Sequence, residues 1–352
     1  MSSDKPESRA TSDSQVVRHL EDGGIAILPT DTVPGLAILA RGDAARRLSI
    51  CKGYGEPRPF ALHLRHMEDL REFLPKPPPG LASWLQQRLP GPWTLVVPSE
   101  WTNLPIDLEW PSATVGFRIP RNEPYVDIAS RLSRPLLMTS VNAPGENPLF
   151  GEALRKWTSS KPEILSCLGD HQPAGIPSTV VVFNPLPEIK RKGGGTDSHL
   201  PGLKVLVLCS GNICRSPVAE SILRREIASS WGVEMDDLES LGWIIHSAGT
   251  FALPGNPPTP ESMEVAAGEG LNLDDHEATP LEIALEDKPD LVLGMAENHL
   301  QSLPPEVAGE LLDPGGSEIE DPFGQGIPAY ETMLVALKSA VRARVEAWSS
   351  WT

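Results

Sequence analysis

The feature that most constrains this chain is an eight-residue loop, CSGNICRS at 209–216, which lies between a strand pattern and a helix pattern. The apolar run at 204–208 suits a buried parallel strand, and Ser216-Pro217 is a favourable helix start with serine as the cap. Apolar residues at 219, 222, 223 and 227 give that helix one buried face. Ligands bind where such strands end and such helices begin, so the pattern predicts a binding loop in a doubly wound parallel sheet.

The residue types in this loop are suited to phosphate. Arg215 and the helix amino terminus both favour the thiolate form of Cys209, which makes it a nucleophile. The guanidinium can contact two phosphate oxygens, and backbone amides of the loop can surround the others. We expect Cys209 to form a phosphocysteine, with Ser216 donating a hydrogen bond to the sulfur as it leaves. The residues expected to bind phosphate or support the loop are Ser210, Gly211, Asn212, Ile213, Cys214 and Ser216.

With its Ser-Pro helix start, the octet resembles the loop of the low-molecular-weight protein tyrosine phosphatase family. The resemblance runs over about 204–348 and includes the segments 246–251, 257–260, 290–295 and 321–323. It implies a phosphatase domain that acts on a phosphoprotein, with no cofactor and no metal. In this likeness Cys209 is the nucleophile and Arg215 binds the phosphate.

A proton donor is also required, because the substrate oxygen must be protonated as it leaves. Two Asp-Pro pairs are candidates, Asp313-Pro314 and Asp321-Pro322. The family's acid lies in a context like the second, before Phe-Gly and the last helix, so the resemblance implies Asp321. The alternative is that the acidic segment 318–321 is only a solvated loop.

The family resemblance includes both protein-tyrosine and protein-arginine phosphatases. The identity of the phosphorylated substrate side chain, tyrosine or arginine, therefore stays open. Ile213 stands where protein-arginine phosphatases carry threonine, and a branched apolar residue there favours an aryl phosphate. The segments 247–252 and 321–324 look closer to the arginine branch. We favour phosphotyrosine, with Phe251 and Phe323 as walls for the ring, the alternative being that both are core residues.

Three further residues in this half have open roles. Cys214 is either a partner for Cys209 in a protective disulfide or a small buried residue. His246 and His299 are expected to be structural.

The first half carries cationic residues among hydroxyls and amides, which suit a nucleotide and a carboxylate better than a metal. Its blocks are PTDTVPGL at 29–36, Lys52, the segment 90–94, Arg118, and the segments 139–142 and 177–180. In this order across 15–195 they resemble the Sua5/YrdC/YciO family, which makes threonylcarbamoyl-adenylate from threonine, bicarbonate and ATP for a tRNA modification. The resemblance implies a mixed α/β twisted-sheet domain with tRNA-modification proteins as partners. It also implies that the domain binds threonine and ATP, the latter with Mg²⁺. The residues implied for this binding are Thr32, Lys52, Arg58, Arg118, Ser140, Asn142 and Ser178.

Two departures from that family pattern keep a second hypothesis open. Pro34 stands where the family usually has tyrosine, and Tyr54 stands where it has arginine. A phenol does not replace a guanidinium beside a triphosphate, although Arg58 is close in sequence. The first half is therefore a synthase, a noncatalytic nucleotide- or RNA-binding module that serves the phosphatase, or a domain with a structural role.

Length and composition set the frame for both halves. A chain of 352 residues is expected to form two domains, and the glycine-rich run at 190–199 marks the joint. We predict a disordered tail at 1–14, a first domain at 15–195, a linker at 196–202 and a second domain at 203–352. A formal charge of −17 argues against general nucleic-acid binding. The sequence has no uninterrupted apolar stretch of about 18 residues, so we expect no membrane-spanning helix. Four cysteines, without a framework of spaced pairs, are typical of a cytoplasmic protein.

Overall fold

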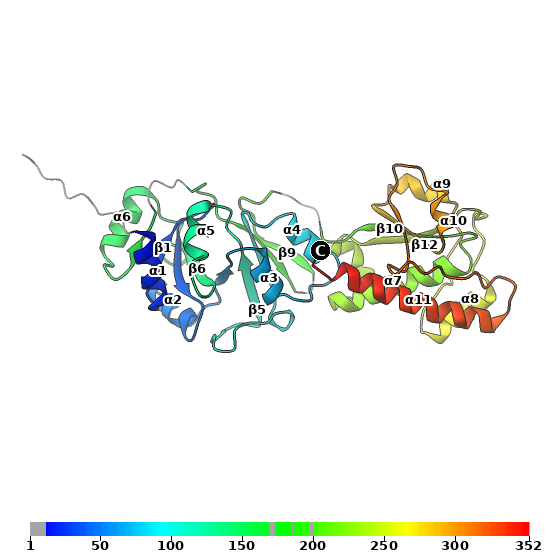
Figure 1. The fold of residues 1–352 in the computed structure, drawn as a ribbon, viewed down its shortest axis with the longest axis horizontal. Coiled ribbons are helices and arrows are strands. Elements are labelled where there is room, and N and C mark those ends of the chain that lie inside the picture. Colours follow the sequence, from blue (N-terminus) through cyan, green and yellow to red (C-terminus); the bar gives the residue numbers. More distant parts are fainter. Residues whose placement is uncertain (1–11, 169–172, 185, 197–199, 352) are drawn as a thin grey trace, which may run out of the picture. The chain divides into compact units, whose positions relative to one another are not determined.

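The computed structural model describes residues 12–168, 173–184, 186–196 and 200–351, which form two compact units (Figure 1). The first unit comprises Met1–Pro75 and Leu85–Ser198, and the second comprises Lys76–Trp84 and His199–Thr352. The short segment Lys76–Trp84, which the sequence analysis placed in the first domain, is thus grouped with the second unit. Helix α4 (Leu81–Gln86) spans that boundary.

The first unit is built on a mixed sheet of nine strands in the order β7-β1-β2-β6-β3-β5-β4-β8-β9. Its strands are β1 (Ala26–Leu28), β2 (Gly35–Leu39), β3 (Ala61–His63), β4 (Trp93–Pro98), β5 (Thr114–Arg118), β6 (Leu136–Ser140), β7 (Leu165–Ser166), β8 (Thr179–Phe183) and β9 (Pro187–Arg191). The prediction of a mixed α/β domain is therefore confirmed.

The helices of this unit lie between the strands. They are α1 (Asp13–Glu21), α2 (Ala44–Lys52), α3 (Met67–Phe73), η1 (Ser99–Trp101), α5 (Glu123–Ala129) and α6 (Gly151–Ser159). Helix α1 starts with a reciprocal cap, because Ser12 Oγ accepts from Gln15 N at 3.4 Å and Gln15 Oε1 accepts from Ser12 N at 3.0 Å. Residues 13 and 14 are thus helical and do not belong to a tail, while residues 1–11 lie outside the described residues.

The glycine run that marked the joint packs against the first unit. Thr179 Oγ1 accepts hydrogen bonds from Gly193 N at 2.9 Å and from Gly195 N at 3.0 Å. A Cβ at Gly193 would lie 2.1 Å from Pro177 O, so this position has no room for a side chain. Glycine serves close backbone contact at 193–195, and residues 197–199 of the predicted linker lie outside the described residues.

The second unit contains a parallel sheet of four strands in the order β11-β10-β12-β13. The strands are β10 (Lys204–Cys209), β11 (Ile244–Gly249), β12 (Leu291–Gly294) and β13 (Gly309–Leu311). The helices are α7 (Arg215–Trp231), η2 (Met235–Leu241), α8 (Pro260–Gly268), α9 (Leu281–Ala284), η3 (Leu285–Asp287), α10 (Glu297–Leu300) and α11 (Ile327–Trp348). The predicted strand at 204–208 is confirmed as β10. The predicted helix is confirmed as α7, but it begins at Arg215, so Cys214 and not Ser216 stands at the cap position.

Both faces of this sheet are covered, as a doubly wound fold requires. Leu206 and Leu208 pack in one cluster with Leu281 at the start of α9. Val205 and Val207 are also buried, and they face the other way because side chains alternate along a strand. Helix α7 packs against β10 and β11, and α11 packs against α7. The loop after β10 is therefore held at the carboxyl edge of the sheet.

Candidate active sites

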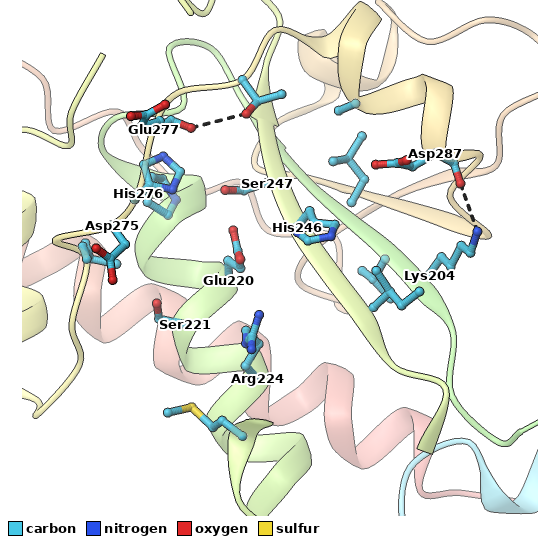
Figure 2. A pocket seen from close by; sticks show the side chains of 18 of the residues that line it. Lys204, Glu220, Ser221, Arg224, His246, Ser247, Asp275, His276, Glu277 and Asp287 are labelled. Atoms are coloured by element: carbon cyan, nitrogen blue, oxygen red, sulfur yellow. Dashed lines mark hydrogen bonds between the residues drawn. The ribbon is translucent and has the colours of Figure 1, made fainter. Parts of the chain in front are cut away.

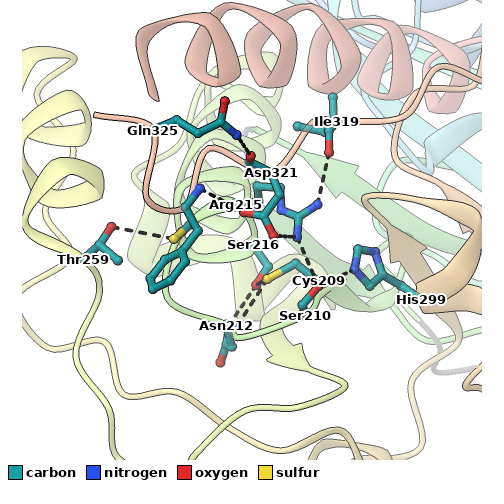
Figure 3. Close-up of polar contacts among 12 residues, drawn as sticks. Cys209, Ser210, Asn212, Arg215, Ser216, Thr259, His299, Ile319, Asp321 and Gln325 are labelled. Carbon is teal, nitrogen blue, oxygen red and sulfur yellow. Dashed lines mark hydrogen bonds and ion pairs between the residues drawn. The ribbon is translucent and has the colours of Figure 1, made fainter. Parts of the chain in front are cut away.

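The cysteine loop of the second unit runs from the end of β10 to the start of α7 (Figure 3). Cys209 is buried, and its Sγ lies 3.2 Å from Asn212 N and 3.0 Å from Ser216 Oγ. Both groups can donate hydrogen bonds to a thiolate, so the loop stabilises negative charge on the sulfur. The structure thus places Ser216 where the sequence analysis expected a donor to the sulfur.

Asn212 occupies the inside of the loop and ties it to two other segments. Its φ of 55° is in the left-handed region, which few residues other than glycine tolerate as readily as asparagine. Its Nδ2 donates to Ser216 Oγ and to Ser247 Oγ, both at 2.9 Å, and its Oδ1 accepts from Thr279 N at 2.7 Å. Asn212 is therefore the brace that the sequence analysis expected.

The glycine at the end of β11 allows this loop to approach the sheet. A Cβ on Gly249 would lie 2.5 Å from Ser210 O and 2.8 Å from Asn212 N. The sequence analysis included Ser247 and Gly249 in the segment 246–251 but assigned them no role, and it did not single out Thr279, a lone residue far from the loop along the chain.

Arg215 lies beside the sulfur and its guanidinium makes three contacts. Nη1 donates to Ile319 O at 3.2 Å, and Nη2 donates to Ser210 Oγ at 3.1 Å and to Asp321 Oδ2 at 2.5 Å. The buried Nε has no partner among the described residues. The guanidinium is therefore fixed in orientation next to Cys209, where a planar fork can bind two oxygens of a phosphate.

The two candidate acids differ in their surroundings. Asp321 reaches Arg215, and its Oδ1 also accepts from Phe323 N at 3.2 Å. Asp313 instead caps its own turn, where Gly315 N and Ser317 N hold the pKa of its carboxyl below the usual range. Of the two, Asp321 is the carboxyl that the structure brings to the cysteine loop.

Phe251 and Phe323 are not core residues. Their side chains are 83% and 63% exposed, so the alternative of buried structural phenylalanines is wrong. Phe251 N donates to Ser210 O at 2.8 Å, which places Phe251 next to the loop. Phe323 follows Asp321 by two residues. Exposed aromatic rings at such a mouth are available to a substrate side chain.

Cys214 is buried, and its thiol packs toward α11. Its Sγ lies 3.3 Å from Tyr330 Oη and 3.7 Å from Thr259 Oγ1. Burial raises the pKa of the Cys214 thiol, although these two hydroxyls act against that change. Cys209 and Cys214 are both free thiols in this structure.

A cavity of about 1020 Å³ lies behind the cysteine loop, between α7 and β11 (Figure 2). His276 on its wall contacts Asn212 O through Nε2 at 2.8 Å. Glu220 faces the same space, and burial raises the pKa of its carboxyl while Ser247 lowers it by a hydrogen bond. Sequence reasoning missed these residues, which form the outer support of Asn212.

The first unit holds a cavity of about 550 Å³ over its sheet. Four residues expected at a nucleotide site line it: Arg118, Ser140, Asn142 and Ser178. Arg118 is buried and forms an ion pair with Asp31, and its Nη2 also donates to Thr32 Oγ1 at 2.6 Å. Thr32 is thus attached to the site through Arg118.

Lys52 joins this site from the end of α2. Its Nζ donates to Ser140 O at 2.7 Å and to Asn142 Oδ1 at 2.5 Å. Burial lowers the pKa of Lys52 to about 8, because it disfavours the charged ammonium. The loop after β6 and the end of α2 are therefore tied together by one lysine.

Unlike Thr32 and Lys52, which reach cavity residues by hydrogen bonds, Arg58 neither lines the cavity nor contacts its predicted residues through its side chain. It is exposed, and its guanidinium carbon lies 5.3 Å from the centre of the Tyr54 ring. Ser178 instead meets Arg191, whose Nη2 donates to Ser178 Oγ at 3.0 Å and which lines the cavity. Arg191, which the sequence analysis did not include among the ligand-binding residues, supplies the second guanidinium.

His63 is a further cavity residue that sequence reasoning missed. It is buried at the end of β3, where burial and then Arg118 lower its pKa to about 3. Its Nδ1 lies 3.0 Å from Ala61 O, which leaves the lone pair of Nε2 as an acceptor. A single histidine on a short strand gives no signal of this role in the sequence.

The side chains and helices of the described part of the chain bear on metal binding and on membrane insertion. No group of three or more His, Cys, Asp or Glu side chains there is arranged to hold a metal ion. None of the helices described there is both long and apolar enough to cross a membrane.

The two units thus define a two-domain protein, with a cysteine-based phosphate loop in one domain and a polar cavity with two guanidinium groups in the other. The Sua5/YciO/YrdC family model, described as "Telomere recombination", matches residues 18–193, half of the chain. The low molecular weight phosphotyrosine protein phosphatase model matches residues 204–348. The chain belongs to the Sua5/YciO/YrdC family through its first half and to the low molecular weight protein-tyrosine-phosphatase family through its second.

Individual relatives match the second half. A probable low molecular weight protein-tyrosine-phosphatase EpsP of Ralstonia solanacearum is 33% identical over 147 residues, which are 40% of this chain and 92% of that protein. The phosphatase Wzb of Salmonella typhimurium is 32% identical over 151 residues, 41% of this chain and 93% of that protein. A protein-arginine-phosphatase of Bacillus subtilis is 28% identical over 149 residues, 40% of this chain and 93% of that protein.

Proposed function

We propose that the second domain hydrolyses protein phosphotyrosine through a phosphocysteine intermediate. The observation that carries the proposal is the position of Arg215, which lies in the same loop as Cys209 and donates from Nη2 to Asp321 Oδ2 at 2.5 Å. Nucleophile, phosphate-binding cation and acid thus meet at one sheet edge. The exposed ring of Phe251 offers an aromatic wall for the phenol of the substrate.

The reaction has two steps. In the first, the thiolate of Cys209 attacks phosphorus, the bond from phosphorus to the phenolic oxygen breaks, and that oxygen takes the proton of Asp321. In the second, water attacks phosphorus, Asp321 takes a proton from this water, and the bond from sulfur to phosphorus breaks. Phosphate leaves, and Ser216 and Asn212 N stabilise the returning thiolate.

The substrate side chain is tested with two peptides on the full chain, one carrying phosphotyrosine and one carrying phosphoarginine. We expect faster turnover of the phosphotyrosine peptide and no turnover of either by Cys209→Ser. His246→Ala, a change on the exposed side of β11, serves as the control and keeps full activity. Preferred hydrolysis of phosphoarginine would overturn the assignment of the substrate, and activity in Cys209→Ser would overturn the mechanism.

We further propose that the first domain is an L-threonylcarbamoyladenylate synthase that uses threonine, bicarbonate and ATP. The observation that favours it is the cavity that gathers Arg118, Arg191, Ser140 and Ser178, with Lys52 fixed to its rim. Two guanidinium groups and hydroxyls suit a triphosphate and a carboxylate. The described residues offer no cluster for a resident metal, so Mg²⁺ is expected to arrive as part of the ATP complex.

This second activity is tested by incubating the full chain with threonine, bicarbonate and labelled ATP. We expect pyrophosphate release that is lost in Lys52→Ala and kept in Lys156→Ala, which changes an exposed lysine on α6. If wild type releases no pyrophosphate, or if Lys52→Ala equals wild type, the synthase is refuted. Binding of ATP or double-stranded RNA without turnover would then support the noncatalytic module.

The proposed activities imply a partner for each domain, and the cysteines bear on the location of the protein. We propose a phosphoprotein as the partner of the second domain and tRNA-modification proteins as partners of the first. The four free thiols are consistent with a cytoplasmic setting, where disulfides are rare.

A further inference from the structure

His299 lies next to the phosphate loop, although the loop follows β10 and His299 follows a different strand. It is part of α10, directly after β12, and β12 is the neighbour of β10 in the parallel sheet. The carboxyl ends of both strands therefore meet at one edge, which brings His299 to the residue that follows Cys209. Its Nε2 lies 2.9 Å from Ser210 Oγ. A dashed line in Figure 3 marks this contact.

Ser210 connects this imidazole to the phosphate-binding cation. Arg215 can only donate, so Ser210 Oγ accepts from Nη2 at 3.1 Å. The remaining contact of the hydroxyl is the one with His299 Nε2. Ser210 therefore lies between the histidine and the guanidinium and contacts both.

His299 is held in this place as a neutral group. Its side chain is 2% exposed, and Nδ1 is buried without a partner among the described residues. Burial and then the Arg215 cation lower its pKa to about 4, while Asp321 and Glu318 act in the opposite direction. A buried ring with one unsatisfied nitrogen costs stability, so a structural role alone is a poor reason for histidine at this position.

The contact matters because Arg215 must lose its carboxylate partner during turnover. When a phosphate binds to the guanidinium, it displaces the Asp321 carboxylate from Nη2, and of the contacts described above only those with Ser210 Oγ and Ile319 O remain on Arg215. We propose that His299 is a positioning residue, which holds the Ser210 hydroxyl against Arg215 and so keeps the guanidinium aimed at the phosphate. This inference rests on the proposed phosphatase function.

The test measures oxyanion binding as well as turnover in the full chain. Inorganic phosphate protects Cys209 from alkylation by iodoacetate, and the concentration for half protection gives its affinity. We expect His299→Ala and Ser210→Ala each to weaken phosphate about fivefold, the effect of one hydrogen bond. The double variant should equal Ser210→Ala alone, because His299 acts through Ser210.

Two further variants separate positioning from folding. His299→Gln places an amide near the position of Nε2 and should restore most of the phosphate affinity, whereas His246→Ala should leave it unchanged. Additive losses in the double variant, or a His299→Ala protein that melts earlier but binds phosphate as wild type does, would overturn the inference. Phosphate protection without turnover in wild type would refute the phosphatase and still leave the role of His299 measurable.

Discussion

Asp321 has two roles whose effects on binding and on catalysis have opposite signs. In the structure it occupies Arg215, the group that a phosphate must contact, and in the proposed reaction it supplies the proton. Replacing Asp321 by asparagine keeps the shape but removes the charge and the proton. We predict that Asp321→Asn binds inorganic phosphate more tightly than wild type while it turns over substrate far more slowly.

The magnitude of the binding effect follows from the exposure of the pair. Arg215 Nη2 and Asp321 Oδ2 are 2.5 Å apart, but the Asp321 side chain is 46% exposed, so solvent screens the attraction. The net value is then that of a largely solvated pair, about 0.5–1 kcal/mol. In Asp321→Asn, phosphate no longer has to break this ion pair when it binds, which corresponds to roughly twofold to fivefold tighter binding. Loss of a general acid lowers kcat by about 10²–10⁴.

The assay combines steady-state hydrolysis of an aryl phosphate with phosphate protection of Cys209 from alkylation. Asp313→Asn is the matched control, since Asp313 caps its own turn and should change kcat by no more than about twofold. Weaker phosphate binding in Asp321→Asn would refute the competition for Arg215. A normal kcat in Asp321→Asn, with a loss in Asp313→Asn, would show that the acid was assigned to the wrong loop.

Two other predictions concern close packing and pH. Gly249→Ala should lower kcat/KM about tenfold or more in the same hydrolysis assay, because the new Cβ would lie 2.5 Å from Ser210 O and push the phosphate loop; Gly268→Ala, which meets open space, should not. Lys52 has its pKa lowered from 10.5 to about 8, so between these pH values the unfolded chain binds a proton that the folded chain has released. The contribution of Lys52 to the free energy of unfolding therefore becomes more favourable as pH rises from about 8. The melting temperature of wild type should then rise relative to that of Lys52→Met in that pH range. Parallel pH dependences of the two melting temperatures would contradict this.

What the sequence could predict of the phosphate site is what lies close together along the chain. Cys209, Asn212, Arg215 and Ser216 share one loop, and the strand before it and the helix after it have clear local patterns. The residues that carry the chemistry of this loop can therefore be read together in the sequence. Its function could therefore be expected before the sheet order was known.

The supports of the loop could not be predicted in the same way. Ser247 is on β11, and His276 and Thr279 precede α9, so they meet Asn212 only because of the order β11-β10-β12. In the first unit, Arg58 is close in sequence to the position of the missing family arginine, but in the structure its side chain lies over Tyr54 and is exposed to solvent. Arg191 reaches the cavity instead, from the edge strand β9.

Both domains hold a buried arginine with one aspartate and one hydroxyl, and the exposure of the aspartate decides what each pair does. Asp31, on Arg118, has a side chain that is 16% exposed, against 46% for Asp321 on Arg215. Release of Asp31 would leave a buried cation without a counter-charge, which costs about 3–5 kcal/mol, so this pair is expected to be permanent. Asp31→Asn should therefore lower the unfolding free energy of the first unit by several kcal/mol, whereas Asp107→Asn, at an exposed and solvent-screened pair with Arg134, should change it far less. Hydrogen exchange in peptides of the first unit would measure both, and equal stability of the two variants would show that Arg118 does not depend on Asp31.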